Sequence, residues 1–387
     1  MKTFFKKSET PKLKNSILIL CVIVLSITIF VKLGVFSNSK NGNKNTNFVE
    51  EIEKIKSITD VAQQSKYYRE LIIRVGPEKA QDELFRSGLP FTGQTHLLNH
   101  EVGNYLYEKF GSGGLLQCKD YFLSSCYHGF LLNVIANGGL PEVAKSFVEC
   151  QKAGPTTSSQ CAHGIGHGFL ANEGYKNLTD ALKVCDTALA SIPGFPAFNC
   201  YDGIFMENIW AVHDGAPSPD RWVKPDDPMY PCNDPRIEDK YLLGCWSNQP
   251  SLAYQLFRGD IKKVADNVCV KVKQAEFQNM CFDGLARQIH PLTNGSATKT
   301  IELCGLMPSQ KWKDFCVSVN AGASYSVGDR TVPFEVCSLM DSPGKTDCYG
   351  RVFSMMKAYK KPGDNLRQLC NNISDSEWRQ KCHNNIN

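Results

Sequence analysis

The sequence lacks most of the short motifs that identify common enzymes and nucleic-acid-binding proteins. It contains no HExxH, GxSxG, phosphate-binding P-loop or Asp-x-Asp motif, and no GxGxxG follows an expected strand. A charge excess is also missing, because outside the first 32 residues 37 Lys and Arg stand against 38 Asp and Glu. Nucleic-acid binding requires a basic surface, so we expect no nucleic-acid partner.

Long apolar runs are scarce, and the clearest one lies near the N-terminus. Residues 1–15 hold five Lys and one Glu, and a mostly apolar segment follows over 16–36. About 20 such residues can cross a bilayer as a helix, and the basic flank stays cytoplasmic. We therefore expect a cytoplasmic tail (1–15), a single-pass transmembrane signal-anchor (16–36) and a polar stem (37–47), with the rest extracytoplasmic or lumenal. The alternative is a cleaved signal peptide, although no small-x-small cleavage site follows.

Cysteine is abundant and regularly spaced. One of the seventeen cysteines, Cys21, lies in the apolar segment, and the other sixteen follow from residue 118 onward. So many cysteines indicate disulfides and an oxidising compartment. They form eight consecutive couples: 118 and 126, 150 and 161, 185 and 200, 232 and 245, 269 and 281, 304 and 316, 337 and 348, 370 and 382.

The spacing of these couples predicts a helical repeat. The second cysteine recurs every 32 to 45 residues, which is typical of two-helix repeat units. It opens motifs such as CYHG, CAHG, CYDG and CFDG, and apolar residues elsewhere follow helical rather than strand spacing. Runs of alternating β-branched residues are scarce. We therefore predict an all-α protein: an α-solenoid of repeats of about 35 residues over 118–387, preceded by a cysteine-free helical region over 48–117.

Two disulfide patterns are compatible with this spacing. One links the start of each first helix to the end of its own second helix, which leaves Cys118 and Cys382 without partners. The other links each couple across its short loop and uses all sixteen cysteines, so it is favoured. Each such bridge would close a loop of about a dozen residues and contribute roughly 3 kcal/mol.

The joins between repeats, in which SFVEC is followed by CAHG, resemble in architecture those of the cysteine-rich Sel1-like helical repeat proteins. The resemblance extends from about Cys118 to Cys382 and rests on spacing. It implies a disulfide-bridged α-solenoid and gives no functional residue.

Five of the eight histidines fall within a short part of the chain. The motifs HLLNH and HGIGH each place two histidines four residues apart, on one face of a helix. Aligning the repeats superimposes the first histidine of each motif on the histidine of CYHG, so we expect a shared region. These candidate metal ligands are His96, His100, His128, His163 and His167.

Imidazole is a favoured ligand of Zn, Fe, Cu and Ni, so the cluster predicts a transition-metal site, with Zn or Fe as the expected ion. Asp202 occupies the repeat position of His128 and His163, and Glu207 follows about one turn later, so these two are candidate carboxylate ligands or general bases. Haem has less support, because no CxxCH motif occurs. Helix capping, a polar packing layer and a metal-free ligand pocket are the alternatives.

Two functional hypotheses follow. One is a membrane-anchored extracytoplasmic scaffold that binds a protein, peptide or glycan through its repeats. The other is a metal-binding protein that acts as a metalloenzyme, a carrier or a sensor. Whether the protein is an enzyme is left open. A proline-rich insertion between His213 and Cys232 is not expected to be helical, and it is either a lid or a surface excursion.

Overall fold

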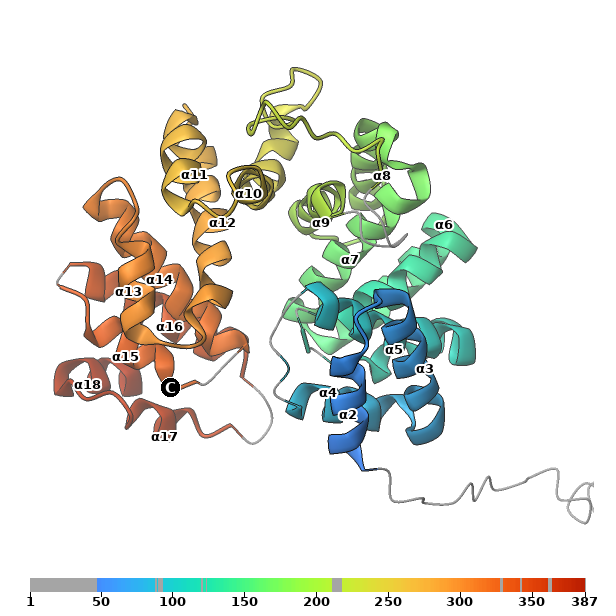
Figure 1. Cartoon of the computed structure of the whole chain (residues 1–387), viewed down its shortest axis with the longest axis horizontal. Helices are drawn as coiled ribbons and strands as arrows, with labels where there is room; N and C mark the ends of the chain where they lie inside the picture. Colours follow the sequence, from blue (N-terminus) through green and yellow to red (C-terminus); the bar gives the residue numbers. More distant parts are fainter. Residues whose placement is uncertain are drawn as a thin grey trace, which may run out of the picture. The chain divides into compact units, whose positions relative to one another are not determined.

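The computed structural model describes residues 47–386, apart from 88, 90–92, 120, 123, 211–217, 328–329, 342 and 361–363. Within these ranges every regular element is a helix and none is a strand, so the all-α prediction is confirmed (Figure 1). The expected tail, anchor and most of the stem lie outside the described residues. Of the helices that are described, none is long and apolar enough to cross a bilayer.

The helices before the first disulfide form the expected cysteine-free region. The apolar spacing of residues 49–64 predicts one continuous amphipathic helix, but the structure breaks that helix at 58–60. The break arises because Asp60 begins a new helix, where its carboxylate accepts a hydrogen bond of 2.8 Å from the backbone nitrogen of Gln63. The helices are α2 (Phe48–Ser57), α3 (Val61–Val75), α4 (Pro77–Arg86) and α5 (Gly93–Phe110).

From α5 onward the chain alternates between two sets of helices. The primary helices pack against one another in chain order, starting with α5 against α6. They are α5, α6 (Ser125–Ala153), α7 (Pro155–Glu173), α9 (Ala197–Trp210), α10 (Asp239–Leu256), α12 (Ala275–Thr293), α14 (Gln310–Val327) and α16 (Gly344–Ala358). The connecting helices are α8 (Leu178–Ser191), α11 (Ile261–Asn267), α13 (Ala297–Cys304), α15 (Val332–Ser338) and α17 (Leu366–Cys370), and α18 (Ser376–Asn385) comes last.

The first part of helix α6 is a primary helix, and its second part is a connecting helix. Its backbone departs from helical geometry at Gly139, where φ is 56°, and Pro141 then opens the second part of the helix. A positive φ strains most residues but not glycine, so the bend falls at this position. The second part ends near Cys150 and takes the place of a connecting helix.

Eight disulfides join neighbouring cysteines, which confirms the short-loop pattern. Each bridge spans 8 to 15 residues, with Cα atoms 5.4 to 6.4 Å apart. Cys150–Cys161 links the end of α6 to α7, and Cys185–Cys200 links α8 to α9. The other pairs are Cys118–Cys126, Cys232–Cys245, Cys269–Cys281, Cys304–Cys316, Cys337–Cys348 and Cys370–Cys382.

Glycines allow adjacent primary helices to touch through their backbones. A Cβ atom added to Gly129 would lie 2.3 Å from the carbonyl oxygen of His100, and one on Gly203 would lie 2.0 Å from that of His163. Any larger side chain would push the helices apart. The glycine of the H-G and D-G motifs therefore brings the residue before it close to the neighbouring helix.

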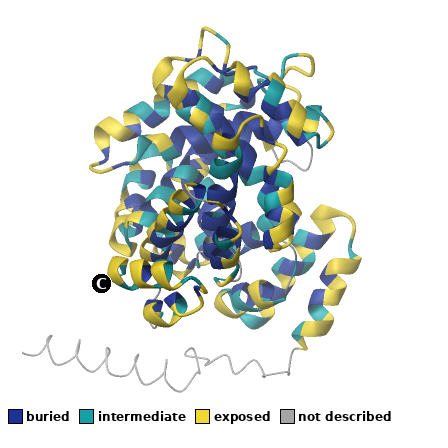
Figure 2. Ribbon diagram, turned by 90° about the vertical axis from the view of Figure 1, so that its left-hand side faces the viewer, coloured by how far each residue is buried: buried dark blue, intermediate teal, exposed yellow. Residues whose placement is uncertain are grey.

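The buried residues gather along the primary helices, while exposed residues lie on the outer turns and loops (Figure 2). Large side chains that are fully buried come from widely separated helices, including Tyr68, Phe130, Tyr241 and Tyr349. The buried core therefore extends over helices that are far apart in the sequence.

The described part of the proline-rich insertion contains turns and no regular helix, as predicted. It is fixed to α9 by two hydrogen bonds between Asn208 and Trp222. The Asn208 amide donates to the backbone oxygen of Trp222 at 2.9 Å and accepts from its backbone nitrogen at 2.8 Å. The segment is thus held beside Glu207, the residue that precedes Asn208.

Candidate metal centre

The structure brings all five predicted histidines into one cluster. His96 and His100 lie on α5, His128 on α6, and His163 and His167 on α7, three helices that pack in sequence. The ring centroids of the contacting pairs are 4.7 to 5.8 Å apart. The spatial arrangement expected from the repeat alignment is therefore present.

The first lobe of the cluster consists of His96, His100 and His128. One candidate ligand nitrogen from each lies within 4.8 Å of the others. Nitrogens that are each 2.0–2.1 Å from one ion are about 3.4 Å apart at a tetrahedral angle, so these three rings would share an ion after closing by up to about 1.4 Å. The Nδ1 atom of His96 donates to the backbone oxygen of Phe122 at 2.8 Å, which leaves its Nε2 as an acceptor or ligand.

The second lobe consists of His163 and His167, whose Nε2 atoms are 3.0 Å apart. The Nδ1 atoms of these rings contact carboxylates: His163 lies 3.0 Å from Asp202 Oδ2, and His167 lies 2.8 Å from Glu207 Oε2. Because a carboxylate accepts hydrogen bonds, both Nδ1 atoms carry the proton in the neutral rings. The two Nε2 lone pairs then face each other and repel unless a proton or a cation lies between them.

The two carboxylates are held by residues that the sequence reasoning missed. Glu207 is fully buried, and its other oxygen accepts a hydrogen bond of 2.5 Å from the Tyr175 hydroxyl. Asp202 accepts one of 2.8 Å from the Asn248 amide. Asn248 stands where the repeats of Cys126, Cys161, Cys200 and Cys281 have glycine three residues after the second cysteine, so this departure was a usable signal. Tyr175 had no comparable signal.

The protonation states suit metal binding. Burial tends to raise the pKa of Asp202, but the hydrogen bond and charge of His163, together with the charge of Arg287, lower it to about 2. Burial lowers the pKa of His128 well below its ordinary value, and repulsion from the other four imidazoles lowers it further. At neutral pH the centre thus contains an ionised carboxylate and a neutral imidazole, which is the ligating form of histidine.

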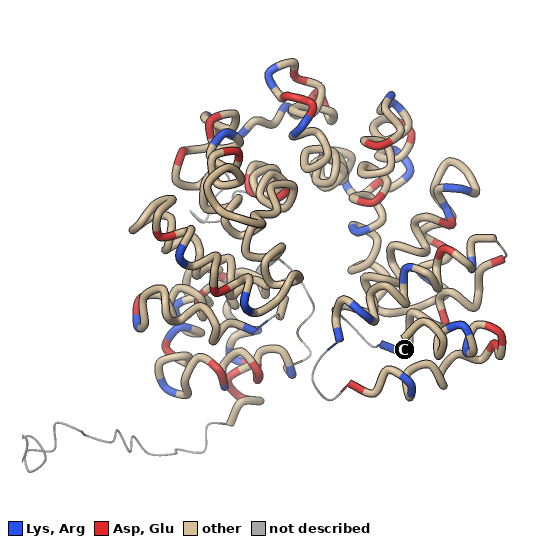
Figure 3. Tube along the Cα trace, turned by 180° about the vertical axis from the view of Figure 1, so that it is seen from behind, with Lys and Arg blue, Asp and Glu red and all other residues tan. Residues whose placement is uncertain are grey.

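The helices around the centre carry few other charges. No Lys, Arg, Asp or Glu occurs from Ser125 to Pro141 or from Pro155 to Ala171, and the tube is tan along these segments in Figure 3. Asp202 and Glu207 on α9 therefore supply negative charge next to the histidines, and these two stretches add no Lys or Arg to oppose a bound cation.

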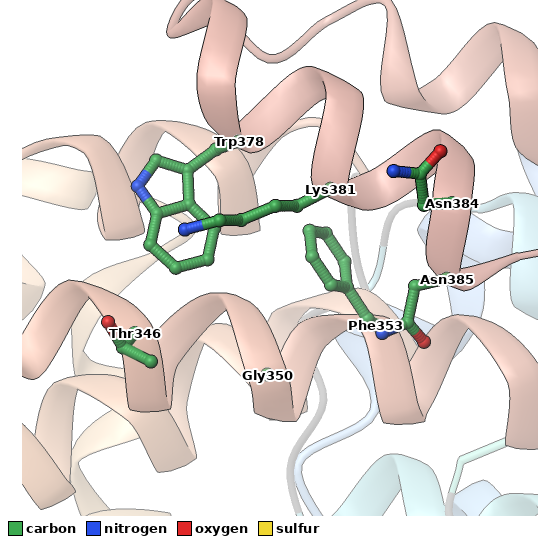
Figure 4. Close-up of a pocket in the computed structure, with 7 residues that line it drawn as sticks. All are labelled: Thr346, Gly350, Phe353, Trp378, Lys381, Asn384 and Asn385. Carbon is green, nitrogen blue, oxygen red and sulfur yellow. The ribbon is translucent and has the colours of Figure 1, made fainter.

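A separate shallow pocket of about 330 Å³ lies between α16 and α18 (Figure 4). Its main aromatic residue, Trp378, stacks on Tyr349 with ring centroids 4.7 Å apart, and the Lys381 ammonium lies 3.9 Å from the indole. The indole surface is therefore already in contact with protein groups. The histidine cluster has the more distinctive chemistry.

Comparisons of the chain with protein-family models, curated proteins and solved structures find no match. The architectural resemblance to Sel1-like repeats therefore stays a prediction.

Proposed function

We propose that the protein is an extracytoplasmic metal-binding protein whose functional centre is the five-histidine cluster. The observation that carries this proposal is the second lobe, where two imidazoles present their Nε2 atoms to each other at 3.0 Å while carboxylates fix their Nδ1 atoms. A carboxylate or backbone carbonyl on the far nitrogen is the usual support of a metal-ligating histidine. Three of the five histidines have such a support: His96 from a backbone carbonyl, and His163 and His167 from carboxylates.

The distance between the two Nε2 atoms also suits a shared ion. Two nitrogens that are each 2.0–2.1 Å from one ion lie about 2.9 Å apart at a right angle and about 3.4 Å apart at a tetrahedral angle. The 3.0 Å separation lies within this range, near its right-angle end. Zn and Fe are the proposed ions, since both accept imidazole nitrogen.

Asp202 and Glu207 are proposed to orient the imidazoles. The oxygens of Glu207 accept from His167 and Tyr175, and those of Asp202 accept from His163 and Asn248. A general base needs an oxygen that can reach a substrate. These contacts therefore favour support of the ligands over the catalytic role that the sequence suggested.

The proposal also covers the cellular compartment and the fold in which the centre lies. Eight disulfides are typical of an oxidising compartment, which supports an extracytoplasmic location behind an N-terminal anchor. Sequential packing of the primary helices supports an α-solenoid of disulfide-linked repeats. The scaffold hypothesis, with a protein, peptide or glycan partner, stays a prediction without a site of its own.

Elemental analysis of the purified full-length chain in detergent tests the proposal. We expect about one equivalent or more of a transition metal after dialysis, and loss of most of it when His163 and His167 are both replaced by alanine. His290→Ala is the matched control, because His290 is a half-buried histidine on α12, outside the cluster. Less than a tenth of an equivalent in the unaltered chain, even after incubation with Zn²⁺ or Fe²⁺, would refute metal binding.

A further inference from the structure

His128 lies between the two lobes of the cluster. Its ring centroid is 5.2 Å from those of His96, His163 and His167 and 5.8 Å from that of His100. Its side chain is almost fully buried, with 2% exposed. It is the one histidine in the cluster with a ring contact to each of the other four among the described residues.

The two nitrogens of the His128 ring face different helices. Nδ1 lies 3.3 Å from Nε2 of His96, on the side of α5. The opposite edge, formed by Cδ2 and Nε2, faces α7: a Cβ added to Gly164 would lie 2.9 Å from Cδ2. Among the described residues, no atom makes a hydrogen bond with this buried Nε2. Such a nitrogen costs free energy unless a ligand satisfies it.

One ion cannot use both nitrogens of this ring, because their lone pairs diverge. An ion in the first lobe would take nitrogens from His96, His100 and Nδ1 of His128. An ion in the second lobe would take the Nε2 atoms of His163 and His167, and the His128 ring, whose centroid is 5.2 Å from both of theirs, would close on the ion to add its Nε2. Each ion then has three imidazole ligands, which is the number typical of a site that keeps an open coordination position.

We propose that the centre binds two metal ions bridged by the His128 imidazole, with one ring nitrogen on each ion. This inference rests on the proposed metal binding and adds its stoichiometry and arrangement. The first ion would take the lone pair of the neutral His128 ring; when the second ion binds, the ring's one N–H proton goes to water and one metal–nitrogen bond to the second ion replaces that N–H bond. No electrons are transferred. Gly164 supports the arrangement because its lack of a side chain leaves room for the His128 edge.

Loading the full-length chain with Cu²⁺ tests the bridge, because an imidazolate between two Cu²⁺ ions couples their spins. After removal of loosely bound copper, we expect two Cu²⁺ per chain and a low-temperature EPR intensity far below two spins. The His163→Ala and His167→Ala double variant should keep one Cu²⁺ with full intensity. His128→Asn should leave no coupled pair, so that all its retained copper is EPR-visible, and circular dichroism would check its fold.

The outcomes separate the two proposals. One Cu²⁺ per chain in the unaltered protein, or two with full EPR intensity, would overturn the bridge while leaving metal binding intact. Absence of any bound metal would overturn metal binding itself. If His128→Asn fails to fold, the unaltered chain and the double variant still decide between a bridged pair and a single ion.

Discussion

The repeats of the first half and those of the second half share one backbone plan but differ in their polar residues. In both halves most repeats carry, two residues after the second cysteine of the disulfide, a side chain that lies between adjacent primary helices; the repeat of Cys348 has Gly350 there. That position holds His128, His163 and Asp202 in the first half, and Ser247, Asp283 and Ser318 in the second. The comparison separates the residues that the repeat fold requires from the histidines that only the first half has at this position.

In the second half, most polar groups between the primary helices meet complementary partners, although Oδ1 of the buried Asn320 accepts no hydrogen bond from a described residue. Arg287 lies 3.1 Å from Asp283 and donates to the Ser247 hydroxyl at 2.6 Å, and the Asn320 amide donates to the backbone oxygen of Ala286 at 3.0 Å. Ion pairs, hydroxyls and amides therefore fill most of the polar layer between the primary helices of this half. A cluster of five imidazoles, in which His163 and His167 face each other through their Nε2 atoms at 3.0 Å, is not explained by packing, which favours a ligand over a polar packing layer.

The strongest expected effect comes from the glycines that both halves use. Gly203→Ala and Gly284→Ala would place a Cβ 2.0 Å and 2.2 Å from backbone oxygens, so each should lower the free energy of unfolding by about 1–3 kcal/mol or more. Only Gly203→Ala should also reduce metal content, because it displaces α9 from His163. Denaturant unfolding and elemental analysis measure the two effects.

Gly350→Ala is the control for this pair, since no atom lies within 4 Å of a Cβ at that helical position. Alanine favours helix over glycine by up to about 1 kcal/mol, so this variant should be neutral or more stable. Equal metal loss in Gly203→Ala and Gly284→Ala would show that the centre depends on the whole repeat array rather than on local packing.

The carboxylates should show a smaller effect that is confined to metal binding. Asp202→Asn and Glu207→Gln keep the side-chain shape but remove the charge that holds the Nδ1 protons of His163 and His167. Loss of such support typically weakens metal affinity about 10- to 100-fold. Asp283→Asn, at the equivalent position of the second half, should leave the affinity unchanged. Competition with a chromophoric chelator measures the difference, and equal affinities in all three variants would contradict the orienting role.

Much of the fold was predictable because cysteine spacing and parity report the repeat directly. The pairing of all sixteen cysteines and the shared region of His96, His128 and His163 both follow from aligning the motifs. The break at Asp60 was missed, because a capping interaction competes locally with a continuous amphipathic pattern. Tyr175 could not be found, since its contact with Glu207 depends on how a loop packs and not on any sequence period.

The smallest expected effect is at Tyr175, and it tests whether the support of the centre extends beyond the carboxylates. Tyr175→Phe removes one buried hydrogen bond to Glu207, worth about 1 kcal/mol, which corresponds to about a fivefold change in an equilibrium constant. Tyr349→Phe is the matched control, because that buried hydroxyl donates to the Phe334 backbone oxygen in the second half. Both variants should lose a similar, small amount of stability, but only Tyr175→Phe should weaken metal binding, by a few-fold. An unchanged affinity would mean that burial alone fixes Glu207, so that the support of His167 ends at the carboxylate.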